Sequence, residues 1–182
     1  MSYKIPSWLP RKEVEGLKLV NELLKHIGVK GVVVGTYALF LQDAAKPYET
    51  KDIEVYVYAG IIYKLGLIET LAPDYGLFFG RSEVGGIYFD YEGVRIELIY
   101  PYGDIYVPEP LLQHVVRIND LLVLEYHAVL IAKALAGVSN VSRALRYMVK
   151  PVSLNKLRKL LKMLSVEERK LVVKRLREVG LF

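Results

Sequence analysis

The fold is decided by the stretch Gly31-Val-Val-Val-Gly-Thr-Tyr-Ala-Leu-Phe-Leu-Gln42, in which a glycine turn interrupts two apolar runs. Residues 31–34 form a short run rich in valine, which predicts a strand. The run stops at Gly35-Thr36, and residues 37–42 have the composition of a helix. The stretch therefore predicts a strand, a tight turn and a short helix.

The flanking segments extend this pattern in both directions. Upstream, apolar residues recur at helical spacing from Val14 to Ile27, and Gly28 suits the C-terminal cap of that helix. Downstream, residues 43–51 lack periodicity and predict a loop, whereas residues 52–58 alternate as a strand does. Further elements are expected as a helix at 61–71 and a hairpin of residues 87–91 and 94–100, joined by Glu92-Gly93.

The second half of the chain is mostly helical in pattern. After a proline-rich loop at 101–110, a short strand is expected at 115–118, and the remaining segments predict helices at 121–136, 140–149, 154–164 and 166–179. Ser165 and Glu168 match a capping box at the start of the last helix. The fold class is therefore α/β (α+β): a mixed sheet flanked by helices, with a C-terminal helical segment.

Size and composition limit the function classes. A chain of 182 residues suits one compact domain with a helical appendage, divided here into residues 1–137 and 138–182. The absence of cysteine excludes disulfides, a cysteine zinc site and a thiol nucleophile. No segment has the pattern of a signal peptide or a membrane span, so we expect a cytoplasmic protein. The scarcity of asparagine and glutamine is typical of a thermophile.

Positive charge is concentrated at the C-terminal end. The formal net charge is +5, yet residues 151–182 alone carry +6 and the rest of the chain carries −1. This distribution predicts a polyanionic partner, such as nucleic acid, for the basic tail. A solvated helix face accounts for it equally well.

Three acidic residues are candidates for a metal site. Asp52 and Glu54 are two residues apart on a predicted strand, so they project from one face with backbones about 6.5 Å apart. Carboxylate oxygens are preferred ligands of Mg²⁺. Glu97, on the second arm of the predicted hairpin, would complete a two-metal clamp. The alternatives are a solvated sheet face for the pair and an exposed edge-strand residue for Glu97.

The turn at Gly35-Thr36 is a candidate phosphate site. It follows an apolar strand and opens a helix, where free backbone N–H groups and the helix dipole favour an anion, and Thr36 adds a hydroxyl. A simple helix cap is the alternative.

The order of these segments resembles the DNA polymerase β-type nucleotidyltransferase superfamily, in particular its small prokaryotic members. The resemblance rests on Val-Val-Gly-Thr-Tyr-Ala-Leu (33–39), Thr-Lys-Asp-Ile-Glu-Val (50–55) and Val-Arg-Ile-Glu-Leu-Ile (94–99). It is extended by Leu-Leu-Val-Leu-Glu-Tyr (121–126) and Lys133. Two positions depart from the usual pattern, because Thr36 replaces Ser or Gly and Glu54 replaces Asp.

The resemblance implies an enzyme that moves a nucleoside monophosphate from a nucleoside triphosphate to a hydroxyl acceptor, with Mg²⁺ or Mn²⁺ as cofactor. Catalysis and metal binding are then expected of Asp52, Glu54 and Glu97, and nucleotide binding of Gly35, Thr36, Lys51 and Lys133. The acceptor could be RNA or protein. The alternative is a catalytically weak nucleotide-binding module whose basic C-terminal helices bind nucleic acid or a protein, in a toxin–antitoxin system for example.

Overall fold

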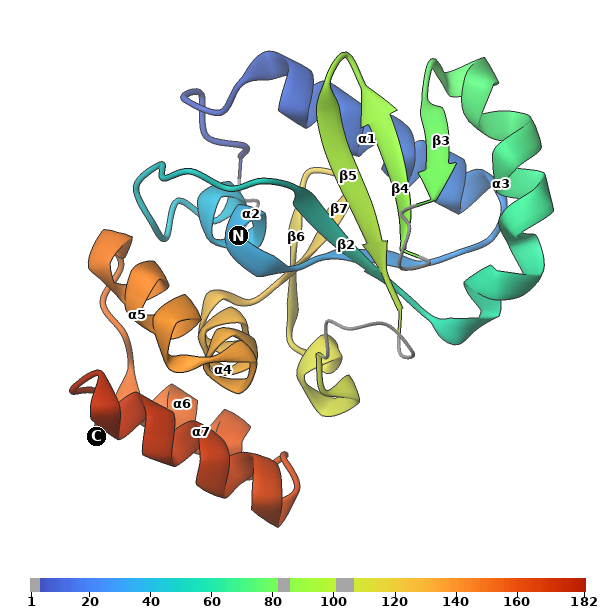
Figure 1. Cartoon of the computed structure of the whole chain (residues 1–182). Coiled ribbons are helices and arrows are strands. Elements are labelled where there is room, and N and C mark those ends of the chain that lie inside the picture. The colour runs from blue at the N-terminus through green and yellow to red at the C-terminus, as the bar shows by residue number, and fades with distance from the viewer. Residues whose placement is uncertain (1–3, 82–85, 101–106) are drawn as a thin grey trace.

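The computed structural model describes residues 4–81, 86–100 and 107–182. Its centre is a seven-stranded mixed sheet with the strand order β3-β4-β5-β2-β1-β7-β6 (Figure 1). The strands are β1 (Gly31–Val33), β2 (Ile53–Val57), β3 (Phe78–Arg81), β4 (Ile87–Tyr91), β5 (Val94–Ile99), β6 (Val115–Ile118) and β7 (Leu121–Leu124). β2 and β5 are parallel, as are β1 and β7, whereas the other neighbours are antiparallel.

Helices surround this sheet. They are α1 (Arg11–His26), α2 (Gly35–Leu41), α3 (Leu65–Leu71), α4 (Tyr126–Ala136), α5 (Val138–Tyr147), α6 (Leu154–Leu161) and α7 (Val166–Glu178), with 3₁₀ turns η1 (Ala59–Lys64), η2 (Ala72–Tyr75) and η3 (Glu109–Gln113). α1 packs on one face of the β4–β5 hairpin, and α4 lies among α2, α5, α6 and α7. In Figure 1, α1 passes behind β4 and β5, while α4–α7 gather at the other end of the molecule.

The mixed fold predicted from the sequence is confirmed, and several of its elements lie where the pattern placed them. The strand, turn and helix of residues 31–42 are β1 and α2, and the predicted hairpin is β4–β5. Its connection uses positive φ at both Glu92 (51°) and Gly93 (80°), which matches the twist of the two strands. The capping box of Ser165 and Glu168 is present at the start of α7.

One predicted element is wrong. The single helix expected at 121–136 is a strand, β7, followed by α4, which begins at Tyr126. Asn119-Asp120, with Asn119 at φ 50°, turns the chain so that Leu121–Leu124 pairs with β6, and β7 also pairs in parallel with β1. Because the run of residues 121–124 is buried in the sheet, it has no polar alternation to distinguish it from a buried helix.

Two other segments differ from the sequence patterns. The helix predicted at 61–71 begins as the 3₁₀ turn η1 and becomes α-helical only at Leu65. β3 was not predicted at all. The first part of the proline-rich loop, residues 101–106, lies outside the described residues.

The C-terminal helices are joined to the rest of the molecule by specific polar contacts. Arg175 on α7 donates hydrogen bonds to the carbonyl oxygens of Ala134 (2.8 Å) and Leu135 at the end of α4. The segment after α5 pairs with the loop after α2, where Lys46 N donates to Tyr147 O (2.8 Å) and Val149 N donates to Ala44 O (2.9 Å). The loop that leads to Asp52 is therefore anchored to the C-terminal helices.

Within the described ranges, we find no helix with both the length and the apolar character needed to cross a membrane.

Candidate active site

The register of the sheet brings two of the three predicted carboxylates side by side. Glu54 on β2 pairs with Glu97 on the parallel strand β5. Paired residues project from the same face of a sheet, as do residues two positions apart on one strand, so Asp52 shares this face. β5 lies between β4 and β2, so Glu97 is not on an edge strand.

Glu54 lies directly against the turn at Gly35. Val34 N donates a hydrogen bond to Glu54 O (2.9 Å), which fixes the start of α2 beside β2. Gly35 has φ +64°, and a Cβ atom at this position would lie only 1.4 Å from Glu54 Oε2. The space that a side chain would fill is thus occupied by the Glu54 carboxylate, and only glycine permits this approach.

Thr36 and Lys133 complete this part of the site. Lys133 on α4 donates a hydrogen bond from Nζ to Thr36 Oγ1 (2.8 Å), and the hydroxyl of Tyr48 donates to the same oxygen (3.3 Å). Tyr48 in turn stacks on Tyr147 of α5, with ring centroids 4.7 Å apart. Since Thr36 Oγ1 accepts both bonds, its own hydroxyl proton is directed elsewhere and can be donated to a ligand.

Burial and charge perturb the two ionisable groups closest to the turn. Burial raises the pKa of Glu54; the neighbouring Lys133 opposes this shift, whereas Glu97 and Asp52 add to it. Burial lowers the pKa of Lys133, with Glu54 opposing the shift and Arg143 of α5 adding to it. Opposed shifts of this kind in a cleft are typical of functional sites.

Glu54 and Lys133 line one pocket of about 240 Å³. Gly35 and Asn140 of α5 add to its polar wall, and the apolar lining comes from α4 together with Val34 and Val107. The sequence did not identify Asn140 or Arg143. They lie three residues apart on α5, so helical spacing puts them on one face of that helix. Only the packing of α5 against α4 brings this face to the site.

Lys51 lies elsewhere. Together with Asp52 and Arg95 it lines a second pocket, of about 220 Å³, on the β5 side of the acidic strand. The sequence grouped Lys51 with Lys133, but only Lys133 lines the pocket at Gly35.

Arg95 was missed by the sequence analysis and lies among the predicted carboxylates. Its guanidinium contacts Glu97 Oε1 through Nη2 (3.0 Å) and Asp52 Oδ1 through Nε (3.5 Å). Strand alternation offered a signal, because Arg95 is two residues before Glu97 and must share its face.

The donor atoms fit a hard divalent ion in their chemistry, because all three side chains are carboxylates on one sheet face. Nevertheless, among residues 4–81, 86–100 and 107–182 no three acidic, histidine or cysteine side chains converge closely enough to hold a metal ion. Arg95, held between Asp52 and Glu97, is a physical reason for this separation.

Similarity to known proteins identifies the family and the fold of this chain. Residues 13–178 match the family described as "Nucleotidyl transferase of unknown function (DUF2204)". No curated protein matches the chain. The antigenic nucleotidyltransferase-like protein from Paracoccidioides brasiliensis shares the fold, with a TM-score of 0.53 at 12% identity over 93% of this chain and 90% of that one.

Two further solved structures have lower scores. JHP933 from Helicobacter pylori has a TM-score of 0.45 at 16% identity, over 93% of this chain and 75% of its own. ANT(2″)-Ia, solved with adenylyl-2″-tobramycin, has a TM-score of 0.48 at 12% identity, over 93% of this chain and 98% of its own. The family match, which spans most of the chain, is decisive: this protein belongs to the DUF2204 family of nucleotidyl transferases and has the nucleotidyltransferase fold.

Proposed function

We propose that the protein transfers a nucleoside monophosphate from a nucleoside triphosphate to a hydroxyl acceptor. The observation that carries this proposal is the pocket at Gly35, where a glycine turn, the Glu54 carboxylate and the Lys133 ammonium meet. A triphosphate needs donors and positive charge on its terminal phosphates and a metal-binding carboxylate near the α-phosphate. This pocket offers both within one cavity.

Each residue has a role in this proposal. The backbone at Gly35, the Thr36 hydroxyl and Lys133 Nζ would bind the β- and γ-phosphates. Asp52, Glu54 and Glu97 would hold Mg²⁺ or Mn²⁺, and the ion would polarise the α-phosphate and lower the pKa of the acceptor hydroxyl.

The chemistry is an in-line displacement. The acceptor oxygen forms a bond to the α-phosphorus as the bond from that phosphorus to the bridging oxygen of pyrophosphate breaks. The hydroxyl proton passes to a carboxylate, for which Glu97 is our candidate, because β5 lies on the far side of β2 from the Gly35 turn. Lys51, in the second pocket, would then act on the acceptor side of the acidic strand.

One observation favours a second candidate, a nucleotide-binding module without turnover. Arg95 forms ion pairs with both Asp52 and Glu97, so its guanidinium competes with a metal ion for these two carboxylates. In such a module the pocket at Gly35 would still bind nucleotide.

A transfer assay tests these two candidates. The protein would be incubated with α-phosphate-labelled nucleoside triphosphates, Mg²⁺ or Mn²⁺, and RNA, protein and small-molecule acceptors, while label transfer and pyrophosphate are measured. We expect Glu54→Gln to reduce transfer by roughly a hundredfold or more, since it removes a charged group that acts in the transition state. Lys133→Met should weaken nucleotide binding, whereas Lys170→Met, at an exposed position of α7, should change neither.

The outcomes are distinct. Transfer that persists in Glu54→Gln would contradict the assigned role of the carboxylates. Nucleotide binding that is lost in Lys133→Met, without turnover of any acceptor by the unmodified protein, would favour the module. Absence of nucleotide binding would refute both.

A further inference from the structure

The face of β3, β4 and β5 opposite α1 is an open surface next to the predicted carboxylates. Figure 1 shows α1 behind these strands, and none of the helices in the described part of the chain covers the other side. Side chains on that side are accessible: Phe78 is 66% exposed and the Arg95 side chain 38%. An acceptor that reaches Glu97 without crossing the pocket at Gly35 must approach over this surface.

Strand pairing arranges the side chains of this surface in rows that lead to the site. Gly80 pairs with Tyr88, Tyr88 with Glu97, and Glu97 with Glu54. The neighbouring row contains Phe78, Asp90 and Arg95. Both rows lie on one face because each pair shares its side and the rows are two residues apart.

The guanidinium of Arg95 stacks on the ring of Tyr88, which belongs to the neighbouring row. The guanidinium carbon of Arg95 lies 4.0 Å from the centroid of the Tyr88 ring, and Glu97 holds the guanidinium in place. The ring itself lies over β3, where a Cβ atom on Gly80 would be 2.3 Å from Tyr88 Cζ. A guanidinium fixed in this way presents a flat surface. In the same row Asp90, which accepts a hydrogen bond from Gly93 N (3.0 Å), lies between Arg95 and the exposed ring of Phe78.

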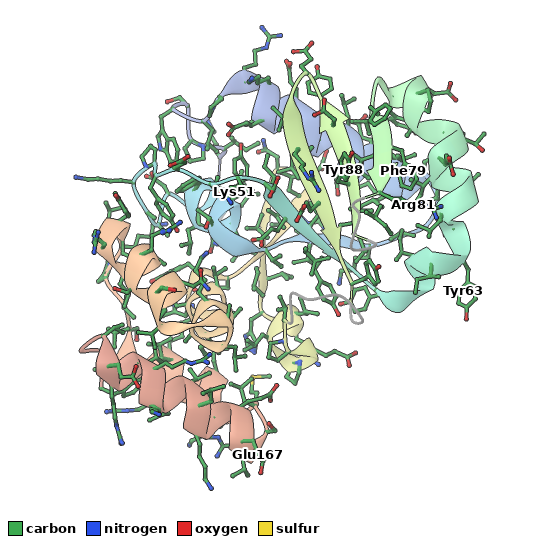
Figure 2. The ribbon with its side chains drawn as sticks, viewed as in Figure 1. Lys51, Tyr63, Phe79, Arg81, Tyr88 and Glu167 are labelled. Carbon is green, nitrogen blue, oxygen red and sulfur yellow. The ribbon has the colours of Figure 1, made fainter. Side chains whose placement is uncertain are left out.

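Two lysines lie at the edge of this surface. Lys12, at the start of α1, and Lys51, just before β2, line the second pocket with Glu13, Asp52 and Arg95, and in the described residues neither lysine has an ion-pair partner. Figure 2 shows Lys51 near the start of β2 and Tyr88 on the β4–β5 hairpin. Flat aromatic and guanidinium groups stack nucleobases, and lysines bind the phosphates between them.

The basic tail is a weaker candidate for the same ligand. Arg169 donates to carbonyl oxygens at the end of α6, Arg175 does so at the end of α4, and Lys156 pairs with Glu125. These three cations, of the nine in residues 151–182, are engaged within the protein. The tail helices also lie at the end of the molecule away from β3–β5 (Figure 1).

We propose that the open face of β3–β5 binds the acceptor, and that the acceptor is the end of a single-stranded nucleic acid. A base stacks on Phe78 and on the Arg95 guanidinium, Lys12 and Lys51 bind phosphate, and the terminal hydroxyl lies toward Glu97. The assignment as acceptor rests on the proposed function, whereas the binding itself does not.

Fluorescence anisotropy with a short labelled single-stranded oligonucleotide tests this proposal on the full chain. Phe78→Ala should weaken binding about tenfold, because one stacked base is lost, and Phe78→Tyr should restore it. Lys51→Ala should weaken binding and lower the slope of log affinity against log salt by about one, as expected for one lost phosphate contact. Both positions are exposed, so the fold should be unaffected.

Two controls match these variants. Tyr63→Ala removes a ring that is 93% exposed on η1, away from the open face of β3–β5, and Lys170→Ala removes an exposed lysine of α7 (Figure 2 shows Tyr63). Neither should change binding by more than twofold.

Several results would overturn the proposal: no oligonucleotide binding, unchanged binding by Phe78→Ala, or a loss in Lys170→Ala that equals the loss in Lys51→Ala. A parallel titration with Mg-ATP separates the two proposals. If ATP binds and the oligonucleotide does not, only the acceptor proposal fails. If the oligonucleotide binds as described and ATP does not, the proposed function fails while the binding surface stands.

Discussion

At the scale of single residues, the site depends on the absence of a side chain at Gly35. Glu54 occupies the volume that a Cβ atom would need, so the glycine turn and the first acidic strand determine each other's position. Burial of this carboxylate removes water from a charged group, which destabilises the ionised form and raises the pKa of Glu54. Destabilising features of this kind are common at functional sites.

Gly35→Ala should therefore lower the free energy of unfolding by more than the left-handed backbone conformation of residue 35 alone explains. Alanine in the left-handed region costs roughly 1–2 kcal/mol, and here the methyl group must also displace Glu54. We expect a lower free energy of unfolding in urea and a loss of nucleotide binding by calorimetry.

Gly76→Ala is the matched control for this change. Gly76 has nearly the same φ (+67°), but a Cβ atom there would meet nothing within 4 Å. Gly76→Ala should lower the free energy of unfolding only by the cost of alanine in the left-handed region, and it should retain nucleotide binding. Equal losses of stability in the two variants would contradict the steric role of Glu54.

At the scale of elements, the start of α4 is joined to α6 through one buried carboxylate. Glu125 accepts hydrogen bonds from His127 N (3.0 Å), His127 Nδ1 (2.9 Å) and Lys156 Nζ (3.0 Å). Ser153 N donates to the other ring nitrogen of His127 (3.0 Å), so Nδ1 carries the proton that bonds Glu125. Burial alone would raise the pKa of Glu125, but the bonds from His127 and Lys156 outweigh it and leave that pKa lowered.

This lowered pKa predicts how Glu125→Gln will behave with pH. The ionised carboxylate stabilises the fold above the ordinary pKa of a glutamate, and that contribution is lost as the pH falls through the lower pKa of the folded state. At neutral pH, Glu125→Gln should cost about 1–3 kcal/mol in the free energy of unfolding.

Unfolding curves measured from neutral to acidic pH would check this expectation. The stability of the original protein should fall toward that of the variant at acidic pH, whereas Glu22→Gln, at an exposed position of α1, should follow the original curve throughout. A difference between Glu125→Gln and the original protein that grows on acidification would exclude our explanation.

The elements also show what sequence alone could predict. α1 and the β4–β5 hairpin were predictable because one face of each is buried and the other is polar. β1 and α2 were predictable because a valine-rich run stops at a glycine turn and a helix-like composition follows it. β7 was misassigned because Leu121–Leu124 is an apolar run without alternation, and its pairing with β1 depends on residues about ninety positions away. The acidic strand was found from spacing, and the same alternation could have identified Arg95, which shares a strand face with Glu97. Arg143 could not be found in this way, because its position depends on the packing of α5 against α4.

At the scale of the whole molecule, the C-terminal helices and the loop before the acidic strand stabilise each other. Residues 44–46 share hydrogen bonds with residues 147–149, and Tyr48 stacks on Tyr147. The division at residue 137 is thus crossed by contacts that hold the path toward Asp52.

We therefore expect that a chain shortened to residues 1–137 will not fold stably. It would lose the partners of the loop at 44–48 and expose the face of α4 that packs on α5, α6 and α7. Circular dichroism would measure the loss of helix, and size-exclusion chromatography would measure the loss of compactness. A cooperative thermal transition in the shortened chain would show instead that residues 1–137 are an autonomous domain.

Gln42, at the end of α2, has a consequence for the motions of this molecule. Its buried side chain donates from Nε2 to Ala38 O (2.7 Å) and Leu124 O (2.8 Å), and its Oε1 accepts from Tyr126 N (3.0 Å). These hydrogen bonds join the end of α2, which begins at Gly35, to the start of α4, which carries Lys133. In hydrogen–deuterium exchange, the amides of both helices should become labelled together as one slow cooperative unit, while the open rim of β3 exchanges early.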